Sequence, residues 1–390
     1  MAKHALLSAS SASRWMKCTP SARLTEKMAD TSSPYAQEGT LAHELGELEL
    51  KRELKLIDKK TYAAELKKIK AHELYGEDMP DYVGIYTGYA MEKLAEAKAR
   101  SKDALVFLEQ RLDFSDWVPE GFGTGDTVII SDGVIEIIDL KFGKGVPVSA
   151  EWNPQMMLYG LGAWNEYDFL YDLHTVRMTI AQPRLDNLST FELSSKELVQ
   201  WAENKLKPTA AMAWDGMGDL CAGKHCQFCK VEASCQARAK AKEDFINDYR
   251  NVDGELLAEH LLAPDDVSRI VGMALEIKNW LKAVEDFALD KALEGFKWPG
   301  YKLVEGRSNR TYSDEAMVAT ILTGKGLTED DIYNKKIKGI TEMEKKLGGK
   351  KKFEEVLGSH IIKPAGKPTL VEESDKRPEL DSVAEDFNLE

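Results

Sequence analysis

The stretch GDTVIISDGVIEIIDLK, residues 125–141, decides the fold of this chain. Two short runs of β-branched residues flank Ser131-Asp132-Gly133, a polar segment typical of a hairpin turn. Asp126 opens the first run, and Asp139 and Lys141 close the second. The pattern predicts two antiparallel strands that bring both acids to the same end of a sheet.

Helical and strand patterns surround this hairpin on both sides in the sequence. The chain therefore belongs to the α/β class, with a mixed central sheet flanked by helices and a helical extension at the C-terminal end. The expected helices cover residues 40–54, 60–102 with a break at 76–80, 153–166, 194–214 and 254–295, the last as a helical hairpin, and the expected strands cover residues 104–109, 127–130, 134–138 and 175–182.

The length of 390 residues allows one large domain with an appendage. We expect a catalytic domain over residues 1–248, a mainly helical region over 249–363 and a disordered tail over 364–390, where charges and prolines leave little to bury. The start of the chain lacks a signal-peptide core, and no stretch is apolar enough to span a membrane. We expect a cytoplasmic protein of a bacterial host cell.

The formal net charge of -14 bears on nucleic-acid binding. Binding over a whole surface requires basic faces that release counterions, so the charge argues against a protein that coats nucleic acid. A local basic channel remains compatible with this composition, because carboxylates that hold metal ions contribute to the acidic balance.

The acids and the lysine have the spacing needed for metal-dependent phosphodiester hydrolysis. Asp139 and Lys141 lie two apart on a strand, so their side chains share a face. The aspartate can hold a divalent cation, while the lysine orients or deprotonates water or offsets phosphate charge. Asp126 can share the metal across the hairpin. Gln155 and Tyr159 share one face of the next helix and can contact DNA or support the metal ligands.

These residues stand in an order that resembles the successive motifs of PD-(D/E)XK nucleases of the RecB type. The motifs are Gly-x-x-x-His at Gly39 and His43, the acid at Asp126, Asp-x-Lys at Asp139 and Lys141, and Gln-x-x-x-Tyr at Gln155 and Tyr159.

The resemblance implies the restriction-endonuclease-like core of these nucleases and a site for Mg²⁺ or Mn²⁺. The metal ligands would be His43, Asp126, Asp139 and the backbone carbonyl of Leu140, and the catalytic lysine would be Lys141. Glu109, on the preceding strand, occupies a place where some members keep an acid.

The five cysteines suggest a second metal centre, because disulfides are rare in a reducing compartment. Cys226, Cys229 and Cys235 provide three ligands, which leave a zinc ion or a cubane cluster one short. Cys221 is the local choice for the fourth ligand, and Cys18, 208 residues before Cys226 (226 minus 18), is the distant one.

One cysteine before the nuclease motifs and a Cys-x2-Cys-x5-Cys run after them resemble the iron–sulfur nucleases of the AddB type. The resemblance implies that Cys18, Cys226, Cys229 and Cys235 bind a structural [4Fe-4S] cluster that staples the domain shut. Closing so long a loop removes about 4–5 kcal/mol of unfolded-state entropy on a polymer estimate. Structural zinc bound by Cys221 and the three later cysteines is the alternative.

The whole chain also resembles a family found in tailed phages and prophages, which implies a setting in DNA replication or recombination. The segments that carry this resemblance are residues 11–15 with Cys18, residues 301–310, residues 367–371 and residues 374–377.

We expect a metal-dependent DNA exonuclease that passes single strands to a phage annealing or single-strand-binding protein. The alternative is a catalytically quiet DNA-binding or scaffold protein of a phage recombination complex. Lys144, Trp152, Arg307 and Arg310 are candidates for holding a strand by charge and stacking. For the two arginines, surface ion pairing is an equal alternative.

Overall fold

A computed structural model describes residues 5–28, 34–249, 262–302, 304, 314–326, 328–333 and 339–361. The chain divides into two compact units, of which the first comprises residues 1–266 and 275–288 and the second residues 267–274 and 289–390. The predicted boundaries at residues 248 and 363 stay predictions.

The first unit is built on a five-stranded mixed sheet in the order β1-β2-β3-β4-β5. All neighbouring pairs are antiparallel except β3 and β4, which are parallel. The strands are β1 (Leu105–Asp113), β2 (Phe122–Ser131), β3 (Val134–Leu140), β4 (Thr175–Gln182) and β5 (Asn187–Ser194).

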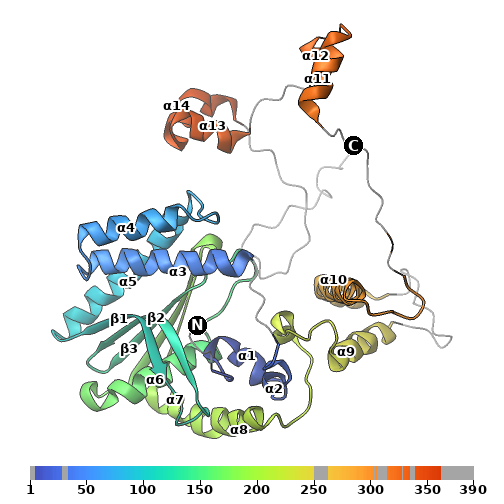
Figure 1. Ribbon diagram of the computed structural model, residues 1–390. Helices are drawn as coiled ribbons and strands as arrows, with labels where there is room; N and C mark the ends of the chain where they lie inside the picture. Colours follow the sequence, from blue (N-terminus) through green and yellow to red (C-terminus); the bar gives the residue numbers. More distant parts are fainter. Residues whose placement is uncertain are drawn as a thin grey trace, which may run out of the picture. The chain divides into compact units, whose positions relative to one another are not determined.

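Helices cover both faces of this sheet (Figure 1). Buried side chains of α3 and α5 pack on one face, and those of α1, α6 and α7 pack on the other. The helices of this unit outside its last segment are α1 (Ala12–Trp15), α2 (Ser21–Thr25), α3 (Pro34–Glu53), α4 (Lys59–Lys70), α5 (Met79–Arg100), α6 (Pro154–Tyr171), α7 (Ser195–Trp201), α8 (Lys207–Asp215) and α9 (Gln236–Asn247).

The remaining described helices follow α9 in the chain. The longest is uninterrupted. The first part of the helical hairpin predicted over residues 254–295, residues 254–261, lies outside the described residues, so the hairpin stays a prediction. These helices are α10 (Pro264–Leu293), α11 (Glu315–Gly324), α12 (Glu329–Ile332), α13 (Ile340–Leu347) and α14 (Lys350–Leu357).

The β2–β3 hairpin forms as the sequence predicts. Ser131 pairs with Val134, so Asp132 and Gly133 alone make the turn. Gly133 has a φ of +74°, which favours glycine, and a Cβ there would lie 2.0 Å from the ring of His174. A residue without a side chain is therefore required at this turn.

The parallel pair β3 and β4 requires a crossover, and α6 provides it. Asn153 caps this helix by accepting hydrogen bonds from the backbone N–H groups of Gln155 and Met156, and Pro154 occupies the first turn. The cap fixes where the helix begins, just beyond the carboxyl end of β3. It thereby sets the position of the first side chains of α6 relative to Asp139.

The predicted α/β class, with a mixed central sheet flanked by helices and a helical C-terminal extension, is confirmed. Sequence reasoning missed β5 and ended β1 four residues early, at Glu109. Arg307, Arg310 and the predicted tail lie outside the described residues. In the part of the chain that the structure describes, no helix combines the length and the apolar character needed to cross a bilayer.

Gly123 in β2 lets two elements approach the strand closely. A Cβ at this position would lie 2.7 Å from Cε1 of Tyr159 on α6 and 3.1 Å from Cβ of Ala9. Replacing Gly123 with Ala should therefore destabilise the protein by about 1–3 kcal/mol, the usual cost of overpacking a core. Urea denaturation measures this change.

Gly143→Ala is the matched control, because nothing lies within 4 Å of a Cβ there. Equal unfolding midpoints for the two variants would contradict the close approach at Gly123.

Candidate metal centre

Asp126 and Asp139 face each other across the β2–β3 pair. Thr127 pairs with Ile138, so the two acids occupy the next position of the same ladder. Oδ2 of Asp126 accepts a hydrogen bond of 2.7 Å from the backbone N–H of Leu140. The hairpin therefore brings the two predicted acids together, and the backbone of Leu140 contacts one of them, Asp126.

His43 reaches this pair from α3. Its Nδ1 lies 3.2 Å from Oδ2 of Asp126. Burial acts to lower the pKa of His43, but the hydrogen bond to Asp126 and the charges of Asp126 and Asp139 outweigh it, so the pKa is raised above its ordinary value. An excess of negative charge at this point favours any cation.

Glu109 is the residue of this group that the motif pattern left without a committed role. Its φ of +48° breaks the regular β1–β2 ladder between Leu108 and Gln110. The side chain of Glu109 is exposed, yet desolvation by surrounding protein atoms and then the charge of Asp126 raise its pKa to about 7. The structure, more than the sequence, therefore singles out Glu109, by its strained backbone and by the negative charges near its carboxylate.

Asp139 is buried, with 1 % of its surface exposed. Nζ of Lys141 lies 2.7 Å from its Oδ2, so this buried oxygen is held in an ion pair with the ammonium. Burial raises the pKa of Asp139 while the charge of Lys141 opposes that change. Burial acts to lower the pKa of Lys141, yet Asp139 and Asp126 raise it overall, so the ammonium stays charged.

Gln155 and Tyr159 hold the other oxygen of Asp139. Nε2 of Gln155 lies 3.2 Å from Oδ1 of Asp139 and 3.0 Å from the hydroxyl of Tyr159, and it donates to both. Tyr159 is buried against the sheet, and its pKa is raised by burial and then by the charge of Asp139. Two roles were expected for this pair, contact with DNA or support of the metal ligands. The contact of Gln155 with Asp139 is compatible with the second role.

These residues fit a hard divalent cation. The ligand atoms of His43, Glu109 and Asp126 lie within 4.8 Å of one another. Oδ2 of Asp139, which pairs with the ammonium of Lys141, is a further carboxylate oxygen beside Asp126. Carboxylates with one imidazole suit magnesium or manganese.

Two of the residues predicted to hold a DNA strand, Lys144 and Trp152, lie in the described part of the chain. Lys144 lies exposed in the loop after β3. Trp152, 54 % exposed, has a φ of +49° and packs its ring 5.4 Å from that of Phe191. Both therefore lie in the segment between Lys141 and α6.

The five cysteines gather around one small cavity of about 20 Å³, although Cys18 stands 208 residues before Cys226 (226 minus 18). The backbone N–H of Cys221 lies 3.5 Å from Sγ of Cys18 and donates to it. Cys18, Cys226 and Cys229 are buried and Cys235 is partly buried, whereas Cys221 is exposed. The distant cysteine thus reaches the same place as the local ones.

The chain belongs to a known family. A family model described as "Protein of unknown function (DUF2800)" matches residues 4–378, which is nearly the whole chain.

Two solved structures are similar to parts of the chain. One is the protein SSO0001, at 13% identity and a TM-score of 0.22, covering 56% of this chain and 95% of its own. The other is named "Putative exonuclease" and comes from Eubacterium rectale, at 11% identity and a TM-score of 0.30, covering 60% of this chain and 87% of its own.

Manganese should bind to this group and raise the melting temperature in proportion to occupancy, because a ligand that binds only the folded state stabilises it by about 2.7 kcal/mol at one hundred times its dissociation constant. Glu109→Gln and Asp126→Asn should each reduce the stabilisation by removing a charged ligand. Calorimetric titration and thermal melting with added manganese measure the effect.

Asp116→Asn is the control, since this exposed acid lies outside the group. If all three variants respond to manganese as the original chain does, the ion binds elsewhere.

Proposed function

We propose that this protein is a divalent-metal-dependent deoxyribonuclease that hydrolyses phosphodiester bonds. The observation that carries the proposal is the buried carboxylate of Asp139, paired with the ammonium of Lys141 and placed beside Asp126. Retaining two neighbouring carboxylates in a sheet costs free energy of desolvation and repulsion. A bound cation would remove that cost.

His43, Glu109, Asp126 and Asp139 would hold the cation. The cation would supply Lewis-acid polarisation of the scissile phosphate and a more acidic bound water. The raised pKa of Lys141 keeps its ammonium charged, which favours offsetting negative charge on the phosphate over accepting a proton. Gln155 keeps Asp139 in one orientation by donating to Oδ1, and Tyr159 holds Gln155 in turn.

Within this proposal the protein is an exonuclease of the RecB type that acts in phage recombination or replication in the bacterial cytoplasm. The order of the motifs around His43, Asp126, Asp139 and Gln155 supports the RecB assignment. The partner would be a single-strand annealing or single-strand-binding protein that receives the exposed strand.

Asp139→Asn and Lys141→Ala should each lower manganese-dependent degradation of labelled DNA by about a hundredfold or more, the range seen when one electrostatic group is removed from a site. The asparagine keeps the volume of Asp139, so folding is retained and circular dichroism checks it. Asp132→Asn, in the exposed hairpin turn, should degrade DNA at the unchanged rate.

Full degradation by Asp139→Asn would contradict the nuclease assignment of this site. If the original chain binds DNA but never degrades it with manganese or magnesium, the catalytically quiet scaffold replaces the nuclease.

We further propose that Cys18, Cys226, Cys229 and Cys235 bind a [4Fe-4S] cluster. Two observations support it over zinc bound with Cys221. Cys18 is buried at the shared cavity and Cys221 is exposed, and the N–H of Cys221 is directed at Sγ of Cys18, as hydrogen bonds to cluster sulfurs are. Within the described residues, moreover, the cysteine sulfurs form no group of three within 4.8 Å, whereas sulfurs around one zinc lie about 3.8 Å apart.

Cysteine replacements separate the two ligand sets. Cys18→Ser should remove the brown colour and bound iron of anaerobically purified protein, while Cys221→Ser should leave both unchanged. Metal analysis and visible absorbance measure the outcome. Colourless protein with one zinc that is lost in Cys221→Ser and kept in Cys18→Ser would establish the zinc alternative.

A further inference from the structure

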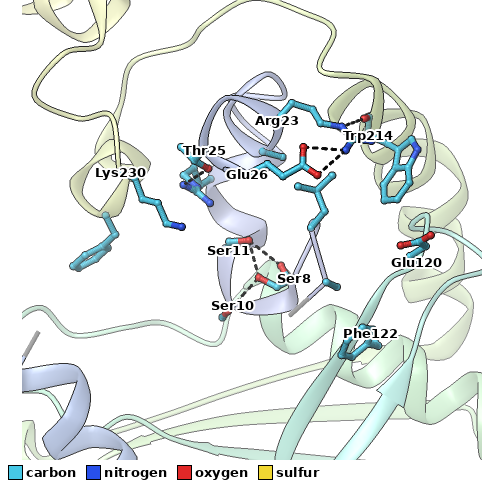
Figure 2. Close-up of a pocket in the computed structure, with 15 residues that line it drawn as sticks. Ser8, Ser10, Ser11, Arg23, Thr25, Glu26, Glu120, Phe122, Trp214 and Lys230 are labelled. Atoms are coloured by element: carbon cyan, nitrogen blue, oxygen red, sulfur yellow. Dashed lines mark hydrogen bonds and ion pairs between the residues drawn. The ribbon is translucent and has the colours of Figure 1, made fainter. Parts of the chain in front are cut away.

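One cavity of the first unit lies apart from the metal centre. It has a volume of about 680 Å³, within the range of ligand pockets. Four parts of the chain line it, as Figure 2 shows: the N-terminal segment, the start of β2, the end of α8 and the cysteine loop with Lys230.

We propose that this cavity binds a segment of a nucleic-acid strand, with a phosphate at its basic groups and a base on its aromatic rings, and holds that strand as it leads to the metal centre. The proposal rests on the proposed nuclease function for the identity of the strand. It assigns a role to residues that the nuclease motifs leave unused.

Three cations line the cavity, from separate elements: Arg14, Arg23 and Lys230. Arg23 pairs with Glu26 at 3.2 Å, so its charge is largely offset. Arg14 donates at 3.4 Å to the hydroxyl of Thr25, a neutral partner, and Nζ of Lys230 donates to the backbone carbonyl of Met28. The carboxylates of Glu26 and Glu120 also line the cavity, so its three cations leave one positive charge in excess for an anion.

Hydroxyl groups lie between these cations. Ser8, Ser10 and Ser11 line the cavity and form a small network, in which the hydroxyl oxygens of Ser8 and Ser11 are 2.8 Å apart. In Figure 2 they lie at the centre of the view, with Lys230 and Arg23 around them. Hydroxyls beside cations are common partners of phosphate oxygens.

Aromatic rings supply the surfaces that a base needs. Phe122, Trp214 and Phe228 all line the cavity. Guanidinium groups already cover one face of two of these rings, Arg111 at 3.7 Å from the centroid of Phe122 and Arg23 at 4.7 Å from that of Trp214, so Phe228 is the ring best placed to receive a base. Phe228 is 85 % exposed, although it stands between two buried cysteines. An exposed ring held by a constrained loop is suited to stacking.

The cavity is connected to the metal centre by β2. Phe122 lines the cavity and Asp126 belongs to the metal centre, and four residues of strand span about 13 Å. Ala9, between the cavity serines, and Tyr159, which holds Gln155, both approach the strand at Gly123. A strand only a few nucleotides long could therefore reach both places.

Rings and cations together favour a nucleic acid over an acidic peptide. Carboxylates of a peptide would use the cations and leave the exposed ring of Phe228 without a planar partner. A nucleotide supplies both groups at a fixed spacing, and stacking works with every base. The two choices are separated by removing a ring and a charge independently.

The test uses the full chain and a fluorescein-labelled oligothymidylate, with affinity measured by anisotropy in EDTA so that no cleavage occurs. Phe228→Ala should weaken binding about tenfold, in the range for losing one base stack. Lys230→Gln should reduce the slope of log K against log salt concentration by about 0.7, the value for one contact to a single-strand phosphate.

Matched controls come from exposed positions outside the cavity. Phe169, 96 % exposed on α6, is the control for the ring, and Lys68 on α4 is the control for the charge. Phe169→Ala and Lys68→Gln should both keep the original affinity and salt dependence. Circular dichroism checks the fold of all four variants, and Phe228→Leu replaces Phe228→Ala if the latter does not fold.

Cavity variants that match their controls in affinity and in salt dependence would overturn the proposal. A lower salt dependence in Lys230→Gln together with unchanged affinity in a folded Phe228→Ala would show that no base stacks on this ring and would also overturn the proposal. Failure of the nuclease function is seen separately, as absence of manganese-dependent DNA degradation by the unmodified chain.

Discussion

The arrangement of the first unit depends on one buried carboxylate, that of Asp139. Burying a charged group beside a second acid costs several kcal/mol unless other groups compensate. Here the ammonium of Lys141, the amide of Gln155 and the N–H that Leu140 donates to Asp126 compensate in part. Apolar residues of similar volume would pack here at lower cost. The excess negative charge is therefore best understood as a binding site for a cation.

Different elements contribute the side chains of this site. The hairpin delivers the two acids, α3 delivers His43, and the capped start of α6 places Gln155 against Asp139. The left-handed bend at Glu109 turns β1 out of its ladder, so that its carboxylate approaches those of the hairpin. The strain at Glu109 and the crowding of charge thus occur at the same place, as expected where a site and not stability determines the residue.

Local sequence patterns predicted the part of the site that is local. The hairpin, the shared face of Asp139 and Lys141 and the start of α6 follow from spacings of a few residues. β5 was missed because two of its less exposed positions, Asn187 and Ser189, are polar, which weakens the alternation expected of a strand. The role of Glu109 depends on its φ of +48°, which no motif encodes. The large cavity draws its lining from four distant segments, so no local pattern could reveal it.

The approach of Cys18 to the later cysteines has a cause that is independent of any metal. Trp15 is fully buried in the core, Thr19 donates to the carbonyl of Met217, and Arg23 donates to the carbonyl of Trp214. Packing and hydrogen bonds therefore already close the loop of about two hundred residues between the two ends of the domain. Most of the loop-closure entropy, about 4–5 kcal/mol on a polymer estimate, is then offset by the fold itself. A metal group bound by these cysteines would fix the exposed loop that carries Phe228 and Lys230, and its main effect would be on the shape of the neighbouring cavity.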